Sequence, residues 1–131
     1  MKVAVDTNVL VRAAVGDDPD QARRACDLLT QAELVVVAMP SLCEFVWVLL
    51  RVYRFAADDV AKAVRALLAC ANVHADRPAA EAGLALLEAG GDFADGAIAY
   101  EGRWLGADAF VSFDKQAVAL LSAQGHSARV L

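Results

Sequence analysis

Apolar positions along the chain form either short continuous runs or longer segments with helical spacing, and polar turn residues separate these segments. Short apolar runs are typical of buried strands, and they lie at residues 3–5, 34–38, 109–113 and 128–131, with a shorter one at Val73. Longer segments with apolar residues at helical spacing predict helices, one beginning after Asn8 and the others at residues 21–31, 40–54, 57–70, 77–89, 92–105 and 115–124. Strands that alternate with helices indicate an α/β fold.

The predicted fold is a small, mainly parallel sheet of four or five strands with helices on both faces. The length of 131 residues, without a linker or repeat, predicts a single domain over residues 1–131. A hydrophobic fraction of 59% excludes a disordered chain. Three cysteines without a CxxC pair favour reduced thiols. We see no signal peptide and no bilayer-length apolar run, so we expect a cytoplasmic protein.

The formal net charge of −5 argues against a basic surface that binds nucleic acid. The placement of the acids changes that picture. Asp6 and Asp114 each follow an apolar strand directly, and ligands of parallel α/β folds bind outside the carboxyl ends of strands. The alternative is structural, because aspartate is also a favoured residue at the N-cap of a helix.

Three further acids stand out. Glu44 is the only charged residue between Leu42 and Leu50, so we expect it to point into the protein or into a cleft. Its alternative is a glutamate held by the dipole of a helix start. Asp92 and Asp95 lie three residues apart on one face of a helix start, where their like charges repel. The alternatives are structural: a helix cap explains one of them, and a solvated helix start could carry both.

Together these carboxylates predict a divalent metal site. An oxygen-only donor set without histidine or cysteine suits one or two Mg²⁺ or Mn²⁺ ions and not zinc. A pair of such ions supports in-line displacement at phosphate. Without the five acids, the 17 acidic residues fall to 12 and equal the 12 basic ones. The acidity is then concentrated in the site.

The chain resembles PIN-domain ribonucleases, and among them the VapC toxins of toxin–antitoxin pairs. The resemblance rests on four segments in matching order: Val5-Asp6-Thr7-Asn8, Glu44 after Pro40-Ser41, Gly91-Asp92-Phe93-Ala94-Asp95, and Val111-Ser112-Phe113-Asp114. It implies a three-layer α/β/α sandwich and an Mg²⁺- or Mn²⁺-dependent endoribonuclease. The implied catalytic acids are Asp6, Glu44, Asp95 and Asp114, with Asp92 as a further metal ligand.

Four further residues are candidates for roles that support the predicted metal site. Asn8 and Ser112 are positioned to orient carboxylates or waters, and Arg12 and Lys115 to meet phosphate oxygens, although all four residue types are also common at solvated turns and helix ends. Gly96 departs from the family, where alanine is usual. We expect it to cost the helix about 1 kcal/mol without affecting metal binding.

Other functions remain open. A phosphotransfer domain also collects acids at strand ends, but Asn8 stands where it would need an aspartate, and Lys115 follows its acid directly. A catalytically silent PIN-like module would have lost acids, and all are present. A PIN nuclease of RNA processing, without an antitoxin, is a further alternative. Metal-dependent cleavage of RNA, with Asp6→Asn as control, separates enzyme from binding module.

The resemblance also implies partners: an RNA substrate, a VapB-type antitoxin and a second copy of the chain in a homodimer. An acidic pocket is an obvious target for an inhibitor. We expect the antitoxin to insert a cation, arginine above all, among Asp6, Glu44 and Asp95, because a guanidinium meets carboxylates in a bidentate way.

Overall fold

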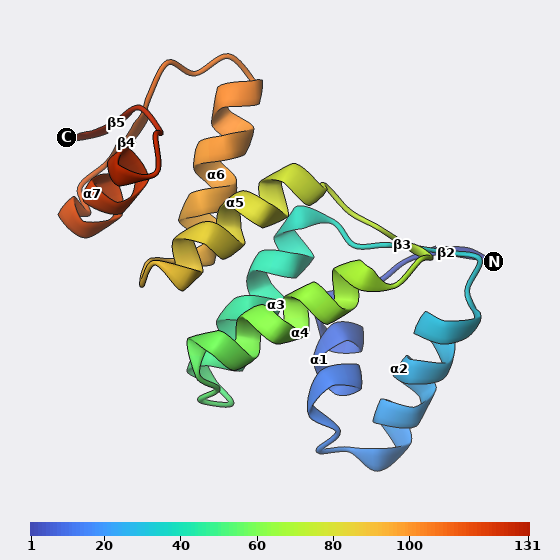
Figure 1. Cartoon of the computed structure of the whole chain (residues 1–131). Coiled ribbons are helices and arrows are strands. Elements are labelled where there is room, and N and C mark those ends of the chain that lie inside the picture. Colours follow the sequence, from blue (N-terminus) through green and yellow to red (C-terminus); the bar gives the residue numbers. More distant parts are fainter. The chain divides into compact units, whose positions relative to one another are not determined.

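The computed structural model describes all residues from 1 to 131 and divides into two compact units, Met1–Asp76 and Arg77–Leu131 (Figure 1). The first unit contains β1 (Lys2–Ala4), α1 (Thr7–Val15), α2 (Pro19–Gln31), β2 (Leu34–Val36), α3 (Met39–Arg51), α4 (Ala57–Ala69) and β3 (Val73–His74). The second contains α5 (Arg77–Glu88), α6 (Phe93–Trp104), β4 (Phe110–Ser112), α7 (Lys115–Ala123) and β5 (Ala128–Val130).

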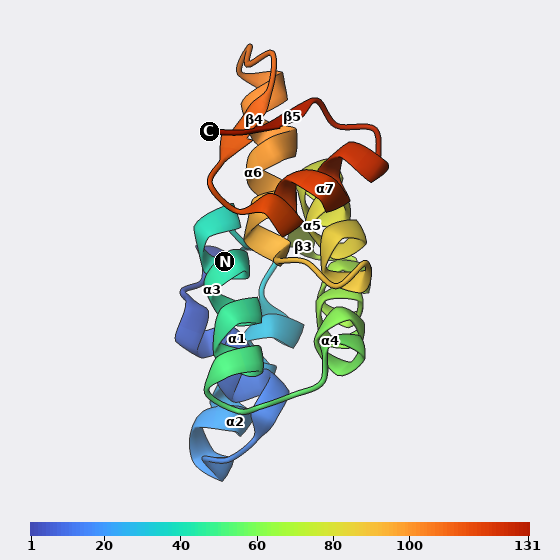
Figure 2. The same cartoon turned by 90° about the vertical axis from the view of Figure 1, so that its left-hand side faces the viewer.

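The first unit is built on a parallel three-stranded sheet in the order β1-β2-β3. The central strand β2 pairs Val35 with Val3 on one side and with Val73 on the other. Val35 is fully buried, as expected for an apolar strand between two neighbours. Helix α1 packs against α2 and α3, and α3 against α4 (Figures 1 and 2). Strand β1 therefore leads into α1, and strand β2 leads into α3, the helix against which α1 packs.

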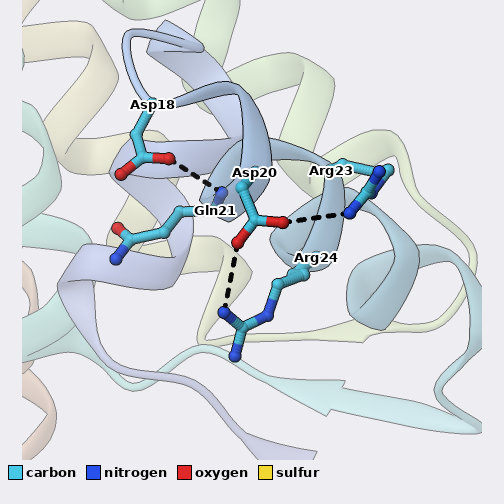
Figure 3. A network of polar contacts seen from close by, with 5 residues as sticks. All are labelled: Asp18, Asp20, Gln21, Arg23 and Arg24. Carbon is cyan, nitrogen blue, oxygen red and sulfur yellow. Dashed lines mark hydrogen bonds and ion pairs between the residues drawn. The ribbon is translucent and has the colours of Figure 1, made fainter.

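Polar contacts between neighbouring residues stabilise the start of helix α2. The Asp18 carboxylate accepts the backbone N–H of Gln21 at 3.1 Å and caps the helix. Within the first turn, the Asp20 carboxylate pairs with Arg23 at 3.0 Å and with Arg24 at 3.3 Å (Figure 3). These pairs are exposed, so each contributes less than about 1 kcal/mol.

The second unit combines a helix pair with a two-stranded parallel sheet. Strand β4 pairs with β5, with Phe110 opposite Ala128. Helix α6 packs closely on α5 (Figure 1). A Cβ atom on Gly96 of α6 would lie 2.4 Å from the carbonyl oxygen of Ala82 on α5, and one on Gly83 would lie 2.7 Å from the Phe93 ring. Both glycines therefore permit this close approach, so Gly96 has a packing role in addition to its expected cost in helix propensity.

The predicted elements are present, with boundaries shifted by a few residues. The α/β class with parallel strands is confirmed, and each predicted apolar run contains a strand. The five strands are hydrogen-bonded as a group of three and a group of two, one group in each unit. Helix α3 ends at Arg51, three residues before the expected end. No helix is long and apolar enough to cross a membrane.

Candidate active site

Asp6 lies between β1 and α1 and caps the helix. Its Oδ1 atom accepts the backbone N–H of Val9 at 3.2 Å. Oδ2 has no hydrogen-bond partner, and the residue is exposed. Structural and functional explanations are thus compatible, because one carboxylate oxygen caps the helix and the other is available to a ligand.

Glu44 comes from the middle of α3 and lies beside the same helix start. Its Oε2 atom accepts a hydrogen bond of 2.7 Å from the Thr7 hydroxyl. Glu44 is exposed, so of the two expected placements the burial in the protein was wrong, and the placement in a cleft stays a prediction. Its apolar neighbours Phe45 and Val46 are buried, and Glu44 lies on the exposed face of the helix together with Trp47. Sequence reasoning missed Thr7 as a supporting residue, although it stands inside the Asp6-Thr7-Asn8 motif.

The second unit holds three of the predicted acids at two helix starts. Asp114 caps α7 by accepting the backbone N–H of Ala117 at 3.1 Å. Asp92 caps α6 with a longer bond of 3.4 Å to the N–H of Ala94. Asp95 lies in the first turn of α6, is half-buried, and accepts no hydrogen bond. Three carboxylates of one unit are thus placed at positive ends of helix dipoles.

The charge of Asp95 is disfavoured in this environment. Burial raises the pKa of its carboxyl above the ordinary value of 3.8, and the negative charges of Asp92 and Asp114 raise this pKa further. A cation placed among the three groups would relieve the repulsion.

Ser112 and Asn8 differ in their contacts. The Ser112 hydroxyl accepts the backbone N–H of Asp114 at 2.9 Å, so it orients the turn that carries the acid. The Asn8 side chain makes no hydrogen bond and is exposed, and its supporting role stays a prediction.

The two predicted phosphate contacts also differ. Arg12 forms an ion pair with Asp17 at 3.0 Å, and this hydrogen bond raises the pKa of its guanidinium. Asp17 also accepts the Tyr53 hydroxyl at 2.9 Å, a bond that lowers the pKa of its carboxyl. A phosphate would have to compete with Asp17 for Arg12. Lys115, the first residue of α7, is exposed without an ion pair.

The donor set fits a hard divalent cation in its chemistry. Asp6 and Glu44 belong to the first unit, and Asp92, Asp95 and Asp114 to the second. All five offer carboxylate oxygens, which Mg²⁺ and Mn²⁺ prefer. Within neither unit do three such side chains have the spacing of a complete ligand set for one ion. The metal ligands therefore stay a prediction, supported by the donor type and by the repulsion at Asp95.

Comparison with known proteins identifies the family. The family model of the PIN domain matches residues 3–120 and so includes all five acids. Comparison with curated proteins finds no match. PIN domains have a nuclease-type fold and usually bind divalent metals, and both properties agree with the parallel strands and the acids at helix starts. The chain belongs to the PIN-domain family.

Proposed function

We propose that the protein is an Mg²⁺- or Mn²⁺-dependent endoribonuclease and the toxin of a toxin–antitoxin pair. The observation that carries the nuclease proposal is the environment of Asp95: burial raises the pKa of its carboxyl, and the charges of the nearby Asp92 and Asp114 raise it further. Carboxylates with perturbed pKa values cluster at functional sites, and a bound cation would relieve the repulsion among these three. The PIN-domain match over residues 3–120 supports nuclease chemistry. The toxin role rests on the VapC resemblance alone.

In the proposed mechanism, Asp6, Glu44, Asp95 and Asp114 hold one or two ions, with Asp92 as a further ligand. A bound ion would lower the pKa of a water and neutralise charge at the scissile phosphate. The residues of the chain position that chemistry. The Thr7 hydroxyl orients the Glu44 carboxylate, and the Ser112 hydroxyl fixes the turn at Asp114.

Cleavage of total RNA by the purified chain tests the activity. We expect cleavage with Mg²⁺ or Mn²⁺ and none with EDTA. Asp6→Asn is the control variant, because asparagine is as good an N-cap as aspartate but carries no charge. It should fold like the wild type and lose cleavage. Equal cleavage by both proteins would refute the proposed site.

Calorimetry tests the metal directly. We expect Mg²⁺ or Mn²⁺ to bind the wild type, and Zn²⁺ to have no specific site because histidine and cysteine are missing from the donor set. Equal Mg²⁺ binding by wild type and by Asp6→Ala would contradict this assignment.

We also propose a VapB-type antitoxin and a homodimer as partners, as the resemblance implies. Exposed apolar side chains such as Trp47, Ile98 and Phe113 are available to a second chain. Light scattering should give a mass above the 13.8 kDa of one chain. A particle of 13.8 kDa at all concentrations would exclude the dimer.

A further inference from the structure

The second unit contains two adjoining cavities at the end of α6 away from the acids. The larger, of about 520 Å³, is lined by residues of α6, of the loop that leads to β4, and of the turn before β5. Its lining includes Gly102, Arg103, Asp108, Phe110, His126 and Ser127. The smaller, of about 360 Å³, is lined by Tyr100, Arg103, Trp104 and His126. Because Arg103 and His126 line both, the cavities are neighbours, and the larger has the size of a small-molecule site.

An aromatic surface borders the smaller cavity. The Trp104 side chain is 75% exposed, and its indole Nε1 donates a hydrogen bond of 2.6 Å to the Tyr100 hydroxyl. This bond holds the indole in place on α6 without covering its ring. A single exposed tryptophan has no functional meaning by itself. Here it stands beside a cation at the edge of a cavity, which is the combination that binds single-stranded nucleic acid.

The charged groups of the two cavities are distributed unevenly. The Arg103 guanidinium and the His126 imidazole make no hydrogen bond or ion pair within the chain, so both are available to a ligand. The smaller cavity has no acid in its lining and suits a phosphate. The larger one adds the Asp108 carboxylate, which repels phosphate, and the Ser127 hydroxyl; both groups can hydrogen-bond the edge of a base.

We propose that these cavities bind two consecutive nucleotides of single-stranded RNA outside the catalytic acids. One base stacks on Trp104, the linking phosphate lies at Arg103 and His126, and the next base enters the larger cavity. The inference deepens the proposed function and rests on it. Arg103 follows Asp95 by eight residues on α6, about 12 Å along the helix axis. The site would therefore hold the substrate strand a short distance from the cut.

Fluorescence anisotropy in EDTA, with a labelled oligouridylate of about 12 nucleotides, measures this binding without cleavage. We expect Trp104→Ala to weaken binding roughly 5- to 150-fold and Trp104→Phe, which keeps an aromatic face, to weaken it far less. Arg103→Ala should reduce the slope of log K against log salt by about 0.7, the value for one phosphate contact. Lys62→Ala is the matched control, because it removes one exposed positive charge from α4 and should change neither quantity.

A second readout observes Trp104 itself. In a Trp47→Phe background, Trp104 is the only tryptophan, and RNA should quench its fluorescence. Circular dichroism confirms that each variant is folded. Wild-type affinity in both Trp104→Ala and Arg103→Ala overturns this site, even if metal-dependent cleavage is intact. Trp104-dependent binding without cleavage in Mn²⁺ refutes the nuclease proposal and leaves the site standing. Loss of a dimer in Trp104→Ala with unchanged RNA affinity assigns the surface to a second chain and overturns the proposal.

Discussion

At the residue scale, the aspartates at helix starts combine a structural and a proposed chemical role. Asp6, Asp92 and Asp114 each cap a helix with one carboxylate oxygen. The cap fixes the position of the second oxygen, which has no partner of its own. Local folding chemistry therefore preorganises the acids before any ion binds.

The raised pKa of Asp95 predicts a pH-dependent effect on stability. The folded state favours the protonated carboxyl, so ionisation at neutral pH costs stability. We expect Asp95→Asn to raise the melting temperature at pH 7 while abolishing cleavage. Water screens the half-buried group, so the gain should stay below about 1 kcal/mol. It should shrink as the pH falls through the pKa of folded Asp95 towards 3.8, the ordinary value.

Thermal unfolding of both proteins between neutral and acidic pH measures this difference. Glu101→Gln is a suitable control, because it removes an exposed carboxylate elsewhere on the same helix. A lower melting temperature for Asp95→Asn at pH 7, with no change on acidification, would contradict the assignment of repulsion at Asp95.

The Thr7–Glu44 hydrogen bond predicts a positioning role for Thr7. Thr7→Val keeps the shape of the side chain but removes the hydroxyl that orients Glu44. We expect metal affinity to fall about 10- to 100-fold, as for other residues that orient ligands, and Thr7→Ser to restore most of it. Calorimetric titration with Mn²⁺ checks this. Equal affinities for the valine and serine variants would show that the hydroxyl has no such role.

At the element scale, the contact of α5 with α6 depends on residues without side chains. Gly96 brings the α6 backbone against the carbonyl of Ala82, and Gly83 accommodates the buried Phe93 ring. Since Asp95 precedes Gly96 directly, this contact also sets the position of a predicted metal ligand. The packing of α5 on α6 therefore also positions Asp95.

Gly96→Ala should destabilise the protein. Alanine improves helix propensity by about 1 kcal/mol, but its Cβ would overlap backbone atoms of α5, an overpacking that costs about 1–3 kcal/mol or more. Gly102→Ala on the same helix is the control, because its Cβ would lie at an ordinary 3.9 Å from Ala107. Chemical denaturation should show a loss for the first variant and a gain of about 0.5–1 kcal/mol for the second. Equal gains would mean that the close contact is not required.

At the scale of the whole molecule, the net charge of −5 and the five acids define how a regulator would act. Carboxylates without a bound cation attract a guanidinium. We propose that an antitoxin would compete with metal by inserting arginine among the proposed ligands Asp6, Glu44 and Asp95. Titration of Mn²⁺ into the complex should show a reduced apparent affinity. Undiminished affinity with the antitoxin bound would indicate a partner at a remote surface.

The sequence by itself determined the elements of this protein and the placement of its acids at helix starts. Hydrophobic period and capping are local properties, so Asp6 and Asp114 were assigned to strand ends without coordinates. Tertiary structure decided what depends on distant segments meeting. It paired Thr7 with Glu44 across 37 residues, exposed Glu44, raised the pKa of Asp95, and placed Gly96 where a Cβ atom would overlap the backbone of α5. Spacing along a chain does not encode such contacts, because they depend on which surfaces pack together.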